Sequence, residues 1–113
     1  MISEEIIKEA VERLVKVAKP QKIYLFGSYA RGDARKQSDL DFLVVEQVMK
    51  NQRKEMVRLH DALRSLRIPV DILVTSESTF NEWADIPGTV MHKAKTEGHL
   101  CYSGGGFPLS FHV

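Results

Sequence analysis

The segment from residue 22 to residue 45 decides how this 113-residue chain folds and where its chemistry lies. It reads Lys22-Ile-Tyr-Leu-Phe26, then Gly27-Ser28-Tyr-Ala-Arg-Gly-Asp-Ala-Arg-Lys-Gln-Ser38, then Asp39-Leu-Asp-Phe-Leu-Val-Val45. Two runs rich in strand-forming residues flank a polar loop that opens with Gly-Ser. The sequence therefore predicts two short strands, 22–26 and 40–45, joined by this loop.

Three aspartates are placed to meet at one end of the predicted sheet. Residues two apart in a strand face the same side, so Asp39 and Asp41 project together, and Asp71 repeats the arrangement in a third strand. Carboxylates about 4 Å apart repel by about 4 kcal/mol per pair at an effective dielectric of about 20. Such a cluster needs protons or cations, and an all-oxygen ligand set favours Mg²⁺ or Mn²⁺. Two such ions would clamp a nucleoside triphosphate for in-line displacement.

The Gly27-Ser28 turn predicts a phosphate-binding loop. Glycine allows backbone N–H groups to approach a phosphate closely, and a helical turn capped by Ser28 would add its positive end. The Ser28 hydroxyl can donate to a terminal phosphate oxygen. Arg31, Arg35 and Lys36 surround the turn with positive charge. For the two arginines, a solvated loop is an equally open interpretation.

The remaining chain predicts helices on both sides of a small sheet. The expected elements are a helix over 3–18 capped by Ser3, a helix over 49–67, a strand over 69–74, a short helix over 79–84 for which Ser76 and Ser78 offer caps, and a last helix ending near 97. This order predicts an α/β (α+β) fold with a small mixed sheet of three or four strands flanked by helices. The Met49/Met56 stripe and Trp83 are expected in the core, and Cys101 as a structural thiol.

Composition bounds the possible functions. Hydrophobic residues make up 43% and charged residues 27%, which is typical of one globular domain. The net charge of +1 argues against nucleic-acid binding by bulk electrostatics, although residues 1–67 hold 14 basic and 10 acidic residues and 68–113 hold 2 and 5. One cysteine, no readable signal peptide and no apolar run of about 20 residues lead us to expect a cytoplasmic protein without membrane association. Residues 1–103 are expected to form the domain, and 104–113 a Gly-rich flexible tail.

Together, Gly27-Ser28, the ten-residue loop, Asp39-Leu-Asp41 and Asp71 in Pro-Val-Asp-Ile-Leu-Val resemble the signature of the DNA polymerase β-like nucleotidyltransferase superfamily. The size of the chain and the motif Gly-Ser-Tyr-Ala-Arg-Gly resemble those of the minimal nucleotidyltransferases. Members of that group are often antitoxin partners of HEPN-domain toxins. The resemblance covers roughly residues 3–102. It implies the polymerase β-like nucleotidyltransferase fold.

The resemblance also implies an activity and its residues. Asp39 and Asp41 would hold two Mg²⁺ ions, with Mn²⁺ as a substitute, and Asp71 would ligate one ion and assist deprotonation of an acceptor hydroxyl. Gly27 and Ser28 would bind the triphosphate. AMP would be transferred from ATP to a tyrosine of a HEPN toxin, in a complex whose oligomeric state stays open. Because so short a chain leaves little sequence for an acceptor site, a second protein is expected to supply it.

Other interpretations remain open at this stage. The aspartates could merely end the strands, and Asp71 could pair with an arginine. The chain could be an antitoxin that neutralises its partner by binding without catalysis, or could nucleotidylate a small molecule.

Overall fold

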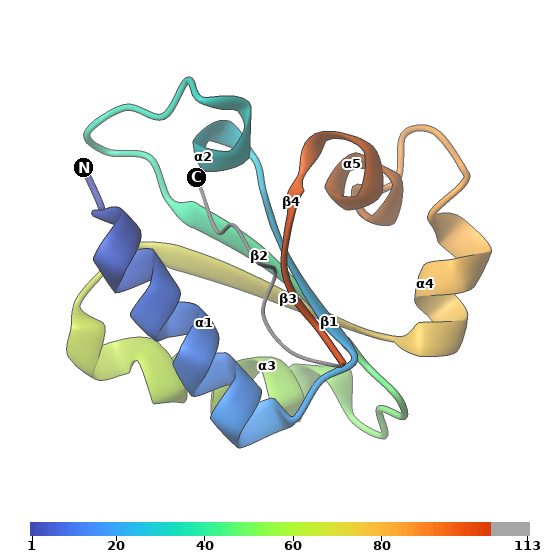
Figure 1. Cartoon of the computed structure of the whole chain (residues 1–113). Helices are drawn as coiled ribbons and strands as arrows, with labels where there is room; N and C mark the ends of the chain where they lie inside the picture. Colours follow the sequence, from blue (N-terminus) through green and yellow to red (C-terminus); the bar gives the residue numbers. More distant parts are fainter. Residues whose placement is uncertain (105–113) are drawn as a thin grey trace.

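A mixed four-stranded sheet forms the centre of the computed structural model, which describes residues 1–104. Its strands are β1 (Lys22–Phe26), β2 (Leu40–Glu46), β3 (Val70–Ser76) and β4 (His99–Ser103), in the spatial order β3-β2-β1-β4. β2 and β3 run parallel, whereas β1 is antiparallel to both of its neighbours, β2 and β4 (Figure 1). The prediction of a small mixed sheet is confirmed.

Helices cover both faces of this sheet (Figure 1). They are α1 (Glu4–Ala18), α2 (Ser28–Arg31), α3 (Gln52–Leu63), the 3₁₀ turn η1 (Arg64–Leu66), α4 (Glu77–Trp83) and α5 (Val90–Glu97). Side-chain caps fix several starts, because a hydroxyl or amide oxygen accepts one of the backbone N–H groups that a helix leaves unpaired. Ser3 accepts from Ile6 and Ser76 from Thr79, as their positions in the sequence indicate.

Alternate residues of β2 belong to two apolar layers, one on each face of the sheet. Leu40, Phe42 and Val44 pack with α1 and α3, while Leu43 and Val45 pack with α4 and α5 on the opposite face. Asp41 shares the parity of the second group and therefore faces the α4/α5 side. The layer under α4 and α5 is the smaller one, and Asp41 lies at its end.

Several boundaries differ from the sequence-based prediction. β4 was not placed by the prediction, which gave the sheet three or four strands without assigning residues 99–103; these five residues pair with β1. α3 begins at Gln52 instead of residue 49, since the Asn51 side chain caps Lys54 N–H; Met49 still packs against the core from the preceding loop.

Trp83 is a correction to the predicted core. Its side chain ends α4 with 41% exposure, whereas Phe80, one turn earlier, takes the buried position and stacks on Tyr24. Cys101 is buried as predicted, and burial raises the pKa of its thiol to about 12. Among residues 1–104, no helix combines the length and apolar character needed to cross a membrane. Residues 105–113, most of the predicted tail, lie outside the described part of the chain.

Candidate active site

The strand register brings two of the three predicted acids side by side. Asp41 pairs with Phe26 of β1 across one ladder and with Asp71 of β3 across the other. Asp39 lies immediately before β2, whose first residue is Leu40. All three aspartates are therefore gathered at the end of the sheet where β1 finishes and where β2 and β3 begin.

Gly27 lies directly against Asp41. Its φ of 74° is in the region that favours glycine, and a Cβ at this position would overlap Oδ2 of Asp41 and lie 3.1 Å from its Cγ. The turn after β1 thus needs glycine for two reasons, backbone conformation and close approach of a carboxylate. The structure corrects one detail: Gly27 is the N-cap of α2 and Ser28 its first residue, so Ser28 does not cap the turn.

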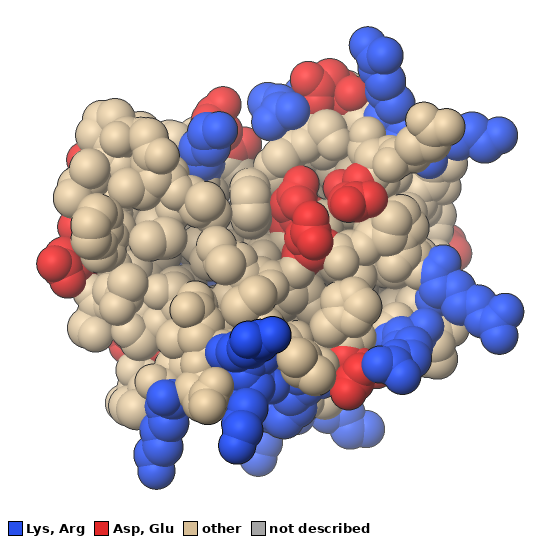
Figure 2. Space-filling model, turned by 180° about the vertical axis from the view of Figure 1, so that it is seen from behind, with Lys and Arg blue, Asp and Glu red and all other residues tan. Residues whose placement is uncertain are grey.

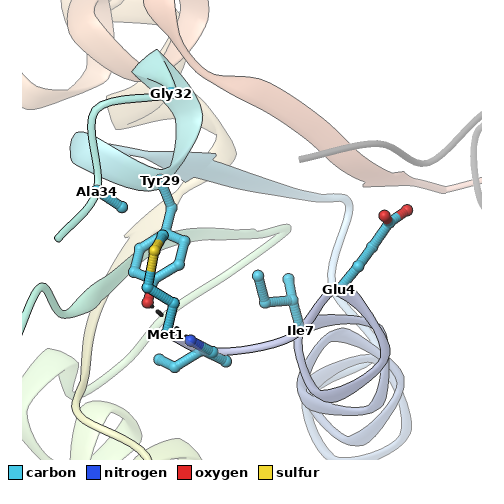
Figure 3. Close-up of a pocket in the computed structure, with 7 residues that line it drawn as sticks. Met1, Glu4, Ile7, Tyr29, Gly32 and Ala34 are labelled. Atoms are coloured by element: carbon cyan, nitrogen blue, oxygen red, sulfur yellow. Dashed lines mark hydrogen bonds between the residues drawn. The ribbon is translucent and has the colours of Figure 1, made fainter. Parts of the chain in front are cut away.

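A buried tyrosine holds α2 in place. Tyr29 is 5% exposed, and its hydroxyl accepts a hydrogen bond of 3.0 Å from the backbone N–H of Ile2 (Figure 3). The ring lies beside Ile7 of α1 in the pocket that these elements form. A helix of only four residues has little stability of its own, so this contact to the N-terminal segment fixes the position of the Gly27-Ser28 turn.

The acids repel one another, as their spacing in the sequence predicts. Burial raises the pKa of Asp41, the nearby charges of Asp71 and Asp39 raise it further, and Arg31 opposes the shift. No ion pair joins any of these three acids to a basic side chain within residues 1–104. Arg31 is placed 3.4 Å from Asp33 instead.

The three aspartates offer the type of ligand that a hard divalent ion prefers, but not a complete set of ligands. Carboxylate oxygens are the ligands that Mg²⁺ prefers, and the carboxylate of Asp41 lies against Gly27. As placed, no three Asp, Glu, His or Cys side chains in the described part of the chain converge on one metal position. Mg²⁺ commonly takes one or two protein carboxylates together with water and substrate phosphates, so the residues present fit an ion that arrives with a nucleotide.

A small pocket adjoins Gly27 on the side away from Asp71. Its volume is about 110 Å³, and it is lined by Phe26, Gly27, Arg31, Lys93 and Glu97. Small-molecule sites usually measure roughly 300–1,000 Å³, so this pocket suits part of a nucleotide, such as its phosphates. Lys93 was missed by sequence reasoning, because nothing near it in the chain marks it. Only the packing of α5 beside β1 brings its ammonium group to the glycine turn.

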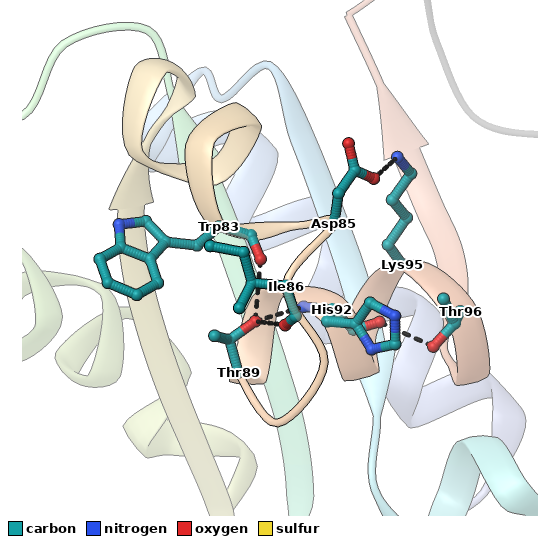
Figure 4. A network of polar contacts seen from close by, with 7 residues as sticks. All are labelled: Trp83, Asp85, Ile86, Thr89, His92, Lys95 and Thr96. Carbon is teal, nitrogen blue, oxygen red and sulfur yellow. Dashed lines mark hydrogen bonds and ion pairs between the residues drawn. The ribbon is translucent and has the colours of Figure 1, made fainter.

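The connection between α4 and α5 fixes the position of Lys93. The Thr89 hydroxyl donates to carbonyl oxygens of Trp83 and Ile86, both at 2.9 Å, and accepts from the His92 N–H at the start of α5 (Figure 4). Lys95, two residues after Lys93, instead pairs with Asp85 at 3.0 Å. The two lysines of α5 therefore have different surroundings, one at the pocket and one at the surface.

The other predicted nucleotide-binding residues, Ser28 and Arg35, do not line this pocket. Ser28 is adjacent to Gly27 and half-buried, whereas Arg35 is exposed in the loop before β2 and does not line the pocket. The role of Arg35 stays a prediction. Figure 2 shows acidic side chains grouped near the centre of one face of the molecule, with most lysines and arginines nearer its edges.

Comparison with known proteins identifies the family. The sequence matches the model of the nucleotidyltransferase domain over residues 4–99. A protein of Methanocaldococcus jannaschii is 36% identical over 84 residues, covering 73% of this chain and 82% of the relative. That relative carries the name protein adenylyltransferase, an activity that is itself a prediction. The chain belongs to the nucleotidyltransferase domain family, and the prediction of a transferase is confirmed.

Solved structures share the fold. A predicted nucleotidyltransferase of Sulfolobus solfataricus superposes with a TM-score of 0.67 at 26% identity, over 95% of this chain and 86% of that one. A toxin–antitoxin complex with AMP-PNP superposes at 0.62 and 22% identity, over 90% and 74%. A complex of tri-AMPylated HEPN toxin of Shewanella oneidensis with its MNT antitoxin superposes at 0.59 and 17%, over 89% and 73%. At these identities, the last two establish the architecture alone.

Proposed function

We propose that this chain is a magnesium-dependent protein adenylyltransferase that transfers AMP from ATP to a tyrosine hydroxyl of a HEPN-domain toxin and so acts as its antitoxin. The observation that carries the proposal is the contact of Asp41 with Gly27, with Asp71 beside it in register and a pocket with two cationic side chains adjacent. The archaeal relative named a protein adenylyltransferase supports the reaction. The AMPylated HEPN toxin held by a protein of the same fold supports the acceptor.

In this proposal the nucleotide lies across the end of the sheet. Gly27 admits the phosphates close to the backbone, Ser28 donates its hydroxyl to them, and Arg31 and Lys93 balance the charge of the leaving pyrophosphate. Asp39, Asp41 and Asp71 would hold two Mg²⁺ ions, which would stabilise the charge that develops on the phosphoryl oxygens. Arg35, in the loop before β2, does not line the pocket and would contact the nucleotide only if that loop folded toward it.

The transfer balances as a single displacement. The acceptor oxygen forms a bond to the α-phosphorus, the bond between that phosphorus and the β-phosphate oxygen breaks, and pyrophosphate leaves on the opposite side. The carboxylate of Asp71 takes the hydroxyl proton. Asp71 is exposed on β3 next to Asp41, where an acceptor from a second protein can reach it.

The direct test combines purified protein, ATP, Mg²⁺ and a HEPN-domain partner, with intact-mass spectrometry of the partner. We expect one or more adenylyl additions with the native protein. Asp39→Asn and Asp41→Asn supply the controls. If they modify the partner as well as the native protein does, the catalytic proposal is wrong.

An antitoxin that acts by binding alone is the second candidate. It is favoured by one observation, that no three potential ligands converge as placed within residues 1–104. The double variant Asp39→Asn/Asp41→Asn separates the two candidates in cells that express the toxin. Rescue of growth by the double variant would favour binding, and failure of rescue by a variant that still binds the toxin would favour catalysis.

A further inference from the structure

A second pocket lies on the other side of Asp71 from the phosphate pocket. Its volume is about 310 Å³, within the range of ligand sites. We call it the acceptor groove and define it by Val57 and His60 of α3, Arg64 of η1, and Asp71 and Ile72 of β3. The groove and the phosphate pocket share no lining residue, and the Asp41–Asp71 pair lies between them in the sheet order.

The β3 wall of the groove is an open sheet edge. Within residues 1–104, β3 has a strand neighbour on one side only. Pro69 directs its carbonyl toward β2, where Leu40 N–H donates to it at 2.9 Å. Alternate residues of a strand direct their backbone N–H and C=O groups to opposite edges, so those of Ile72 and Val74 point away from β2, toward the open edge. The Val74 carbonyl accepts a hydrogen bond of 2.7 Å from the Gln52 side chain. Gln52 therefore covers the edge near Val74, and the stretch at Ile72 borders the groove.

The α3 wall offers apolar surface. Val57 is 56% exposed, which is unusual for a valine in a helix that packs on a core. The groove is also lined by Met56 and by Asp61, whose carboxylate pairs with the Arg64 guanidinium. This surface suits an extended polypeptide with apolar side chains, and such segments commonly bind by adding to an open strand edge.

The reaction geometry assigns this groove to the acceptor. An in-line displacement requires the attacking oxygen to approach from the side opposite the leaving group. If pyrophosphate leaves toward Gly27, Arg31 and Lys93, the acceptor must arrive from beyond Asp71, where the groove lies. By strand alternation the Asp71 side chain belongs to the face of Asp41, so the groove reaches the acids around the edge of β3.

We propose that the acceptor polypeptide docks in this groove as an extended segment beside Ile72 and Val57 and delivers its tyrosine hydroxyl to Asp71. The proposal rests on the proposed transferase function and adds where the protein substrate binds. The rest of the partner contacts the outer surface of α3.

The test compares the same substitution at two exposed valines. Val57→Glu changes the groove, whereas Val48→Glu changes a 70% exposed valine in the loop after β2, at the opposite end of the sheet. The probes are ATP, AMP-PNP and the HEPN-domain partner used above. Three quantities are measured for each variant: affinity for AMP-PNP, affinity for the partner by titration calorimetry, and steady-state adenylylation as a function of partner concentration.

We expect Val57→Glu to weaken partner binding and raise the KM for the partner by about tenfold, with kcat and AMP-PNP affinity unchanged, and Val48→Glu to match the native protein. Arg64→Glu, which alters a side chain that is 77% exposed, should act in the same direction. Native-level partner affinity and KM in both groove variants would overturn the proposal. If the native protein binds the partner without modifying it, the transferase function fails and the affinities still decide the groove. If it does not bind the partner, both proposals fail.

Discussion

The two ends of β2 each carry a half-buried carboxylate whose pKa is raised by burial and by neighbouring carboxylates. The negative charge is compensated differently at the two ends. At the first end, Asp41 lies among Asp71 and Asp39, with no ion pair to any of the three in the described part of the chain. At the last end, Glu46 lies against Glu55, which Arg58 holds through two hydrogen bonds of 2.7 Å. The negative charge around Asp41 has no ion-paired basic partner in the described part of the chain, whereas Arg58 balances the charge of the Glu46–Glu55 pair.

The pKa shifts express this difference. Burial, and then the contact with Glu55, raise the pKa of Glu46 to about 8, whereas hydrogen bonding from Arg58, and then Glu46, lowers the pKa of Glu55 to about 2. At neutral pH the pair therefore holds one proton and one charge, and Arg58 balances the charge. Asp41 has no such arrangement, which is what a site that recruits a cation and a polyphosphate requires. The predictions that follow test this contrast from the largest effect to the smallest.

Asp41→Asn should cause the largest change. We expect adenylyl transfer to fall about 10²–10³-fold, because the amide removes a charge placed next to the reacting phosphate. Stability should stay level or rise, since a carboxyl whose pKa is raised by folding lowers stability once the pH exceeds that pKa. Transfer rate and thermal unfolding measured together provide the check. A clear loss of stability would mean that Asp41 is a structural residue.

Gly27→Ala should damage both fold and activity. With φ 74° and ψ −156°, Gly27 lies in a region that is essentially restricted to glycine and costs about 1–3 kcal/mol for a residue with a Cβ, and the overlap with Asp41 Oδ2 adds to that or displaces the carboxylate. Gly88→Ala is the matched control, because Gly88 has a φ of 93° with no atom within 4 Å of a Cβ. Denaturant unfolding should show the backbone cost in both variants, and only Gly27→Ala should lose transfer activity. Equal activities would contradict the role assigned to this contact.

Lys93→Ala should weaken nucleotide binding by about tenfold, the usual scale for losing one charge-assisted contact to phosphate. Lys95→Ala serves as the control on the same helix, because it removes only a surface pair with Asp85. Titration calorimetry with AMP-PNP measures both variants. Should the two bind the nucleotide equally, the phosphates do not occupy the pocket that Lys93 lines.

Glu46→Gln should have the smallest effect and none on transfer. Glu46 has a folded pKa above its unfolded value, so its deprotonation lowers stability as the pH rises through about 8. Its Oε2 is also buried without a hydrogen-bond partner. The glutamine variant, which cannot ionise, should unfold a few degrees higher than the native protein at pH 9, with the difference shrinking toward pH 5. Melting curves at both pH values decide the matter, and a lower melting temperature at pH 9 would show that the charged carboxylate is stabilised after all.

Much of the site follows from local chemistry and could be predicted. Gly-Ser after a strand, Asp-x-Asp at the head of the next strand and an acid in a third strand each carry a local signal, because alternation and turn geometry are properties of neighbouring residues. The helix starts at Ser3 and Ser76 were also predictable, since a cap acts over three residues.

The failures involve contacts between distant segments. The residue type predicts that Trp83 is in the core. Phe80 is instead buried against Tyr24, and the indole of Trp83 is exposed. Likewise, β4 becomes a strand because β1 offers it an edge. Neither outcome is coded in the neighbouring sequence, because burial and strand pairing depend on what the rest of the fold presents.

By itself, the sequence determined the family and the mixed sheet, and it predicted Gly27, Asp39, Asp41 and Asp71 as residues of the site. Only the tertiary structure decided that Asp41 touches Gly27, that Lys93 reaches the same turn, and that β3 keeps an open edge beside α3. The physical reason is the distance along the chain over which each feature is determined. Motifs are set by backbone geometry over a few residues, whereas pockets and edges arise where helices and strands far apart in the chain pack together.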